Sequence, residues 1–166
     1  MNFLIFAAFS ENMADKKPIK EIVNRKAKFE YAFLQMFEAG LVLTGTEVKA
    51  LRQGMANLTD AYCIFDHENL TVKNMFIAEY DHGTVYNHDA RRDRRLLLKR
   101  SELNKLERRV TEKGLTIVPY RLYFSERGLV KLEIALAQGK KAFDKRETIK
   151  ERDYKKAMDR IKLIKL

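Results

Sequence analysis

Apolar side chains recur at every second position in several segments of the chain, and this pattern limits the possible folds more than any other feature. The clearest example consists of Val130, Leu132, Ile134 and Leu136. A period of two places successive side chains on opposite faces of a β-strand. Strands are therefore predicted at residues 29–37, 61–65, 70–77, 116–124 and 129–137.

Short helices are predicted between these strands. Thr46 is a suitable N-cap for a helix over residues 47–52, and Gly54 is a suitable end. Ser101 opens a second helix, which Gly114 ends. A mainly β chain with two or three flanking helices fits a small antiparallel barrel, closed or nearly closed. Periodicity alone does not separate such a barrel from a sandwich.

The last two strands are predicted to form a hairpin. Residues 125–128 form a polar turn that ends in glycine, and they join segments 116–124 and 129–137. Pro119 lies inside the first of these segments. Because proline has no N–H to donate to a neighbouring strand, Pro119 is expected at a sheet edge or at a bulge.

The sequence changes character at Gln138. The last 29 residues contain 11 Lys or Arg against 5 Asp or Glu, and they show no alternation. Positions 154, 157, 158, 161 and 164 are apolar and would share one face of a helix. A single unpacked helix is marginal in water. Residues 138–166 are therefore predicted to be disordered in the free protein and to fold on a polyanionic partner.

The charge of the whole chain favours a nucleic-acid partner. Lys and Arg number 33 against 23 Asp and Glu, a net charge of +10. Basic residues gather in an arm over residues 16–28, in the tail and in a cluster of Arg91, Arg92, Arg94 and Arg95. Arginine forks donate pairs of hydrogen bonds to phosphate. Aromatic residues near these segments, which suit stacking on unpaired bases, are Tyr80, Tyr86 and Phe143.

Other classes of function are less well supported by the residues. His67, His82 and His88 match no tight metal spacing, and no glycine-rich phosphate loop or Gly-x-Ser-x-Gly motif is present. We therefore predict no catalytic site, no metal and no cofactor. Cys63 is the single cysteine and is expected to be a small buried hydrophobe. The basic terminal helix could lie on anionic lipid, but its apolar face is thin and lacks Trp.

The first ten residues are unusually apolar, but they suit neither a secretory signal nor a membrane span. No basic residue precedes Lys16, and ten residues are too few to cross a bilayer. A cytoplasmic location is expected. The composition changes abruptly at Glu11, so Met13 is a candidate for the physiological start. The chain is accordingly divided into a leader (1–15), a barrel (16–137) and a tail (138–166).

Several motifs together resemble the bacterial SsrA-binding protein family, also called small protein B. The resemblance covers about residues 22–152, and its motifs follow one another in a specific order. They are Asn24-Arg25-Lys26-Ala27, Phe37-Glu38-Ala39-Gly40-Leu41, Gly45-Thr46-Glu47-Val48-Lys49, Asp60-Ala61-Tyr62, Arg95-Leu96-Leu97-Leu98, Val118-Pro119, Gly139-Lys140-Lys141 and Asp144-Lys145-Arg146.

The resemblance implies an OB-like barrel that binds the tRNA-like domain of transfer-messenger RNA (tmRNA) and delivers this RNA to stalled ribosomes for trans-translation. It also implies a monomer that joins elongation factor Tu in the delivery complex. The tail is implied to form a helix in the empty messenger channel of the small subunit, near the decoding centre.

Individual site residues follow from the resemblance and from the basic segments. The residues implied to bind RNA are Asn24, Glu38, Leu97 and Lys131, to which charge adds Arg25, Lys26 and the arginine cluster. The residues implied to face the ribosome are Gly139, Lys140, Lys141, Asp144, Lys145 and Arg146. Phe143 stands where the family often has His or Tyr, which preserves stacking but removes a hydrogen bond.

Glu38 is an unexpected member of an RNA-binding set, because a carboxylate repels phosphate. It could accept hydrogen bonds from base edges or a 2′-hydroxyl, or orient a neighbouring Arg or Lys. A purely structural salt bridge is the third possibility, and the sequence leaves all three open.

Overall fold

The computed structural model describes residues 21–83 and 87–164. Its elements follow the order β1 (Ile22–Val23), α1 (Arg25–Glu30), β2 (Tyr31–Leu41), α2 (Gly45–Arg52), β3 (Ala56–Asn57), β4 (Tyr62–Asp66), β5 (Asn69–Lys73), β6 (Phe76–Ile77), β7 (Arg94–Leu97), α3 (Arg100–Lys113), β8 (Thr116–Phe124), β9 (Val130–Gly139) and α4 (Ala142–Ile164).

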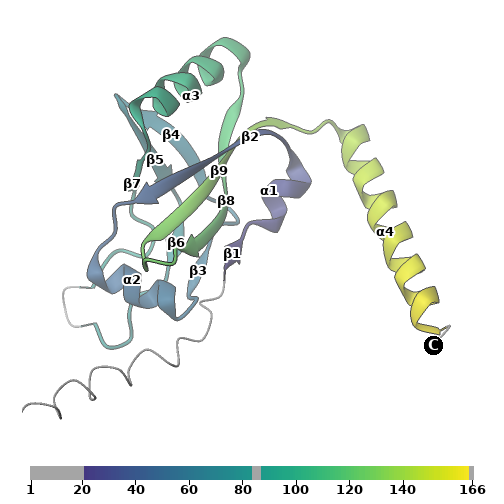
Figure 1. Ribbon diagram of the computed structural model, residues 1–166, viewed down its shortest axis with the longest axis horizontal. Coiled ribbons are helices and arrows are strands. Elements are labelled where there is room, and N and C mark those ends of the chain that lie inside the picture. The colour runs from purple at the N-terminus through teal and green to yellow at the C-terminus, as the bar shows by residue number, and fades with distance from the viewer. Residues whose placement is uncertain (1–20, 84–86, 165–166) are drawn as a thin grey trace, which may run out of the picture.

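Six of the strands form a ring in the order β2-β7-β5-β4-β8-β9, and every neighbouring pair is antiparallel. The shortest strand pairing in the ring is the one between β4 and β8, where Cys63 lies opposite Ile117. Strand β1 pairs with the far end of β8, and β3 pairs with β6 in a separate ribbon. Figure 1 shows the strands wrapped around a common interior. The predicted small antiparallel, OB-like barrel is confirmed.

The alternation of apolar residues accounts for the barrel core. Leu132, Ile134 and Leu136 of β9 point inward and are fully buried. Ala135 and Ala137 of the same strand point outward, yet they too are buried because α1 packs over them. The outer surface of the barrel therefore carries a small second core beneath α1.

Part of the predicted basic arm has regular structure, since residues 22–28 form β1 and the start of α1, and its basic residues Arg25, Lys26 and Lys28 are exposed. Asn24 is buried and caps α1, its Oδ1 accepting from the Ala27 N–H at 2.9 Å. Its amide nitrogen donates to the carbonyls of Leu58 and Pro119, at 2.7 and 3.2 Å. Bonds to carbonyls so distant in sequence could not be read from the local pattern.

Several helix and strand boundaries differ from the predicted ones. The first long strand begins at Tyr31, after α1, and continues to Leu41. The predicted strand at 70–77 is two strands, separated at Asn74, whose φ of 56° interrupts the extended backbone. The helix expected over 47–52 is α2, but its N-cap is Thr44. The bulge expected at Pro119 is confirmed by a register shift beside it.

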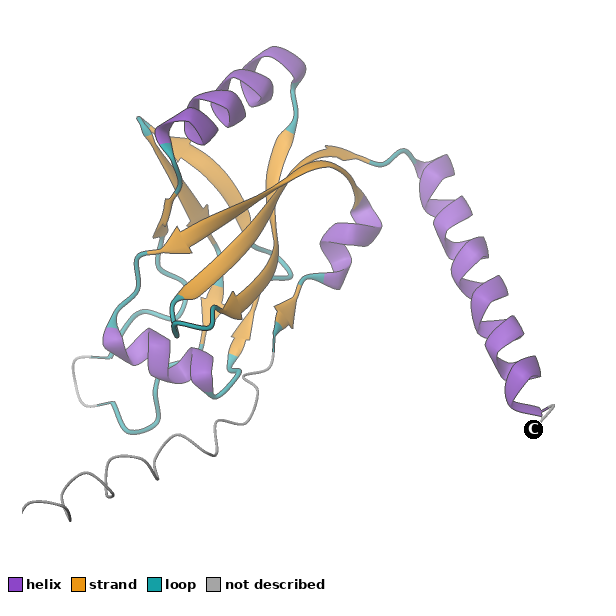
Figure 2. Cartoon of the chain, viewed as in Figure 1, coloured by secondary structure: helices purple, strands orange, loops and turns teal. Residues whose placement is uncertain are grey.

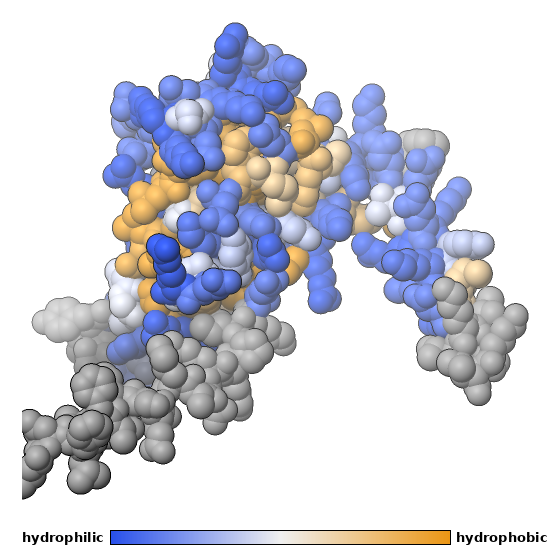
Figure 3. Space-filling model, in the orientation of Figure 1, coloured by the Kyte–Doolittle hydropathy of each residue, from blue (hydrophilic) through white to orange (hydrophobic). Residues whose placement is uncertain are grey.

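Helix α4 extends away from the barrel, and its first turns lie near α1 (Figures 1 and 2). Figure 3 shows hydrophilic side chains over most of α4 and over α3. All residues from 149 to 160 are exposed, so little tertiary packing supports the helix. Because an unpacked helix is marginal in water, disorder of the tail in the free protein stays a prediction. Within residues 21–83 and 87–164, no helix is long and apolar enough to cross a membrane.

Candidate RNA-binding surfaces

The arginine cluster is divided by the structure into buried and exposed members. Arg94 is completely buried, and its Nε donates to Glu47 Oε1 at 2.8 Å. Its remaining donors bind the carbonyls of Met75 (2.6 Å), Arg92 (3.0 Å) and Ala90 (3.2 Å). This guanidinium therefore fixes the loop before β7 to the barrel and presents no charge to solvent.

Glu47 anchors this network from α2. Its side chain is fully buried and also accepts from Arg92 Nε at 2.8 Å and from the Thr44 N–H at 2.7 Å. Burial acts to raise the pKa of the Glu47 carboxyl, but hydrogen bonds from Arg92, Thr44 and Arg94 outweigh it and lower the pKa from 4.5 to about 2. Glu47 is therefore ionised across the physiological range.

The other two arginines are presented to solvent. Arg91 is exposed, its guanidinium 5.6 Å from the centre of the Phe76 ring and 2.6 Å from Asn74 Oδ1. Arg95 is exposed on β7. Phosphate contact from this cluster can thus come from Arg91, Arg95 and the half-buried Arg92.

A second surface crosses four strands on the outside of the barrel. Strand pairing places Leu97 of β7 opposite Gly40 of β2, Gly40 opposite Lys131 of β9, and Lys131 opposite Tyr123 of β8. Glu38 lies two residues before Gly40 and therefore on the same face. We call Glu38, Leu97, Tyr123 and Lys131 the outer-face row. Three residues named from the resemblance are thus brought together, although they lie far apart in sequence.

Glu38 connects this row. Its Oε1 lies 3.0 Å from Lys131 Nζ, and its Oε2 accepts a hydrogen bond from the Tyr123 hydroxyl. The bonds from Tyr123 and Lys131 lower the pKa of the Glu38 carboxyl. The hydrogen bond between the Tyr123 hydroxyl and Glu38, together with burial, raises the pKa of Tyr123 to about 12.

Tyr123 was missed by sequence reasoning, although a usable signal was present. The predicted hairpin turn at 125–128 brings β8 and β9 together, so Tyr123 and Lys131 could have been paired by counting outward from the turn. Arg121 lies two residues before Tyr123, with its guanidinium 4.9 Å from the centre of the tyrosine ring.

Residues of α1 form a third basic region, close to the tail. Arg25 and Lys26 are exposed, and Lys26 makes an ion pair with Asp60 at 3.3 Å. Asn24, by contrast, is buried, so its contribution to RNA binding would act through the position of α1.

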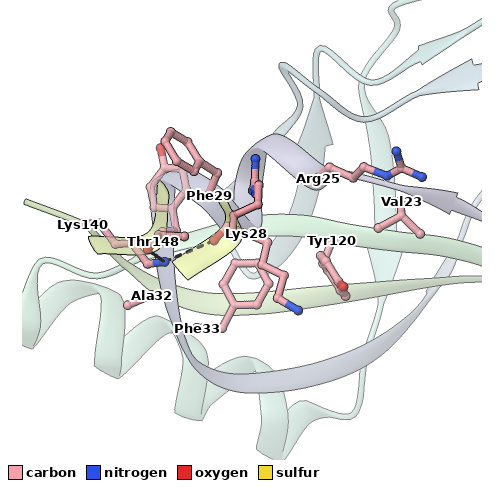
Figure 4. Close-up of a pocket in the computed structure, with 11 residues that line it drawn as sticks. Val23, Arg25, Lys28, Phe29, Ala32, Phe33, Tyr120, Lys140 and Thr148 are labelled. Atoms are coloured by element: carbon pink, nitrogen blue, oxygen red, sulfur yellow. Dashed lines mark hydrogen bonds between the residues drawn. The ribbon is translucent and has the colours of Figure 1, made fainter. Parts of the chain in front are cut away.

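A pocket of about 400 Å³ opens where α1, β2 and β8 meet the first turns of α4 (Figure 4). Its aromatic residues are Phe29, Tyr31, Phe33 and Tyr120. Its cationic residues are Arg25, Lys28, Lys140 and Arg152. None of its 11 lining residues is acidic. Aromatic walls with a cationic rim are suited to an unpaired base and its phosphate.

The first tail residues are tied to α1. Gly139 ends β9 opposite Tyr31, and the Lys140 N–H donates to the Glu30 carbonyl at 2.9 Å. The Lys140 ammonium lies 3.4 Å from the Lys28 carbonyl, at the C-terminal end of α1, where a cation is favoured.

The first turn of α4 is capped by the side chain of Asp144. Asp144 accepts from the Lys141 N–H at 3.2 Å and is exposed, as is Arg146, whereas Lys145 is half-buried. Phe143 belongs to α4 by its backbone, and its side chain lies outside the described residues.

Of the histidines considered for catalysis, His67 and His82 are exposed, whereas His88 is part of the packed barrel. His88 is buried, with Nδ1 3.0 Å from Thr46 Oγ1 and Nε2 3.3 Å from the Ile77 carbonyl. Cys63 is buried, which raises the pKa of its thiol and confirms its interpretation as a small hydrophobe. Among the described residues, no group of three or more His, Cys, Asp or Glu is placed to hold a metal ion. Tyr86 lies outside the described part of the chain.

Comparison with known proteins places this barrel in one family. A profile of the SmpB protein family matches residues 21–163. An SsrA-binding protein of Christiangramia forsetii is 55% identical over 140 residues, covering 84% of this chain and 89% of that protein. The SsrA-binding protein of Cytophaga hutchinsonii is 52% identical over 153 residues, covering 91% of this chain and all of that protein (100%).

The fold gives the same result. A chain of the solved structure "tmRNA-SmpB: a journey to the center of the bacterial ribosome" has a TM-score of 0.62 and 45% sequence identity, and the match covers 76% of this chain and 87% of that one. Sequence and structure agree over the barrel, and the chain belongs to the SmpB protein family.

Proposed function

We propose that this protein binds the tRNA-like domain of tmRNA and delivers it to stalled ribosomes for trans-translation. The observation that carries the proposal is the outer-face row, which gathers Glu38, Leu97 and Lys131 from three strands onto one exposed face. The family relationship supports the same partner, since the matched structure is described as "tmRNA-SmpB" in the bacterial ribosome.

The barrel and the tail have separate tasks in this proposal. The barrel supplies a fixed surface that recognises folded RNA, and the tail enters the empty messenger channel of the small ribosomal subunit. Helix α4 has 23 residues, which at 1.5 Å each gives a rod of about 35 Å. Its excess of basic residues favours a channel walled by RNA.

The attachment of the tail to α1 gives the rod a direction. Lys140 binds the C-terminal end of α1, and the Arg152 guanidinium lies 5.7 Å from the centre of the Phe29 ring. Residues from 139 to 146 would then face the decoding centre, close to the body that holds the RNA. We further propose a cytoplasmic monomer that joins elongation factor Tu in the delivery complex.

The experiment is reconstituted tagging of peptides on ribosomes stalled on a message without a stop codon. A chain ending at Gln138 is compared with the full chain for two readouts, tmRNA affinity and tagging. The proposal expects affinity for the tRNA-like domain within about threefold of the full chain and loss of tagging. Undiminished tagging by the shortened chain would contradict the role of the tail.

A second variant for the tagging assay is the full chain carrying Lys155→Gln and Lys156→Gln. These exposed lysines lie on α4 beyond the residues named for the decoding centre. Their replacement lowers the positive charge of α4 without removing the helix. Tagging that falls partway and recovers at lower salt would support an electrostatic contact with the channel.

A further inference from the structure

The carboxylate of Glu38 is already engaged by protein donors. One oxygen lies 3.0 Å from the Lys131 ammonium, and the other accepts from the Tyr123 hydroxyl. Its charge is therefore directed at two neighbours on β8 and β9. A phosphate approaching the same carboxylate would be repelled.

Tyr123 is held in one orientation and keeps hydrogen-bonding capacity. Its hydroxyl donates to Glu38, while the Arg121 guanidinium lies 4.9 Å from the centre of its ring. After donating one hydrogen bond, a phenol oxygen still has a lone pair that can accept another. The groups of RNA that could donate to it are a ribose 2′-hydroxyl and the amino group of a base.

The cations beside Glu38 and Tyr123 are paired with carboxylates. Lys131 pairs with Glu38, and Arg121 pairs with both Glu133 (2.7 Å) and Glu21 (3.2 Å). Two cations thus face three carboxylates. Leu97 adds an apolar side chain that is 51% exposed. The surface around Tyr123 is therefore suited to hydrogen bonds and apolar contact with sugars and bases, whereas contact with phosphate falls to the exposed Arg95, two residues before Leu97 on the same face of β7.

We propose that Tyr123 is a further RNA-contacting residue, which accepts a hydrogen bond from a 2′-hydroxyl or a base amino group, and that Glu38 is a positioning residue for Tyr123 and Lys131. The inference rests on the proposed binding of tmRNA. It assigns to Glu38 a task that its negative charge permits, because Glu38 never touches the RNA.

The first test is the affinity of the full chain for the tRNA-like domain of tmRNA at several salt concentrations. Tyr123→Phe removes one hydroxyl and no charge, so we expect binding about fivefold weaker with an unchanged dependence on salt. Tyr62→Phe is the matched control, because Tyr62 is 45% exposed on β4 and lies outside the outer-face row. Wild-type affinity in Tyr123→Phe, measured on RNA that the wild type prefers over bulk tRNA, overturns the contact by Tyr123.

The second test separates positioning from contact by Glu38. Glu38→Gln is measured alone and in a background that already carries Tyr123→Phe and Lys131→Gln. A positioning residue loses its effect once both partners are changed, so no further weakening is expected in that background. If Glu38→Gln weakens RNA affinity by the same factor in both backgrounds, Glu38 contacts the RNA directly and the inference is overturned.

Thermal unfolding of every variant shows whether the fold is kept, and Glu112→Gln, an exposed carboxylate on α3, serves as a second control. Different results would contradict the proposed function and the proposed role of Tyr123. A wild-type protein with no preference for the tRNA-like domain contradicts the proposed function itself. Normal preference with an ineffective Tyr123→Phe contradicts only the present inference.

Discussion

Replacing Glu47 by glutamine removes the centre of the network that fixes the arginine loop. The Glu47 side chain is 0% exposed and accepts hydrogen bonds from Arg92, Arg94 and the Thr44 N–H. Glutamine has nearly the same shape, but it turns an amide donor toward one of these donors and leaves Arg94 buried without its counter-ion. Breaking a buried ion pair in this way costs about 3–5 kcal/mol.

The pKa of Glu47 gives an independent magnitude. Lowering the pKa from 4.5 in the unfolded chain to about 2 in the folded one corresponds to about 3 kcal/mol of stability at neutral pH. Because the folded pKa is the lower one, this stability is present above about pH 4.5 and is lost as the pH falls toward 2. The two approaches agree on a loss of about 3 kcal/mol.

The assay is denaturant unfolding of the wild type and of Glu47→Gln, at pH 7 and at several values between pH 5 and 3. We expect a difference in unfolding free energy of about 3 kcal/mol at pH 7 that narrows as the pH falls. Glu112→Gln is the control, since its pair with Arg108 is exposed and should change stability by less than about 1 kcal/mol. A loss of unfolding free energy below about 1 kcal/mol in Glu47→Gln, or one that is independent of pH, would show that Glu47 does not stabilise the fold as a buried counter-ion.

Three further predictions follow from particular residues. Asn24→Ala removes the cap of α1 and two buried amide bonds, so the free energy of unfolding should fall by about 2–3 kcal/mol in denaturant titration; an unchanged midpoint would count against the cap. Gly114→Ala places a side chain at a φ of 58° and should cost about 1 kcal/mol by thermal unfolding, whereas a stabilised variant would disagree with this geometry. Arg91→Gln with Arg95→Gln should lower the slope of log affinity against log salt by about 2; Arg108→Gln is the control, and equal slopes for all would deny the arginines their phosphate contacts.

The barrel could be predicted from the sequence because its strands alternate clearly. Val130, Leu132 and Ile134 alternate with polar or small residues, and they do line the core. The α3 helix was predicted by its apolar spacing and by Gly114 at its C-terminal end, whereas Ser101, expected to open it, lies inside the helix, whose N-cap is Lys99. Helix α1 was not predicted, because only Ala27 among its residues is buried and the residue that caps it, Asn24, is held in place by carbonyls far away in the sequence.

The site was less accessible to sequence reasoning, since its geometry depends on contacts between distant elements. Four arginines of one cluster look equivalent in the sequence. The buried Arg94 differs from the exposed Arg95 through its partners, which are Glu47, more than 40 residues away, and the carbonyl of Met75. Similarly, the roles left open for Glu38 narrowed only when strand pairing placed Lys131 and Tyr123 beside it.

The decisive measurement for RNA recognition is the affinity for the tRNA-like domain of tmRNA, at about 150 mM salt and in the presence of excess bulk tRNA. Bulk tRNA carries the same phosphate charge, so a protein that binds through charge alone cannot prefer one folded RNA over the other. The account predicts tight binding that bulk tRNA does not displace. Binding that bulk tRNA abolishes would rule out specific recognition of tmRNA and would leave a general basic RNA-binding protein.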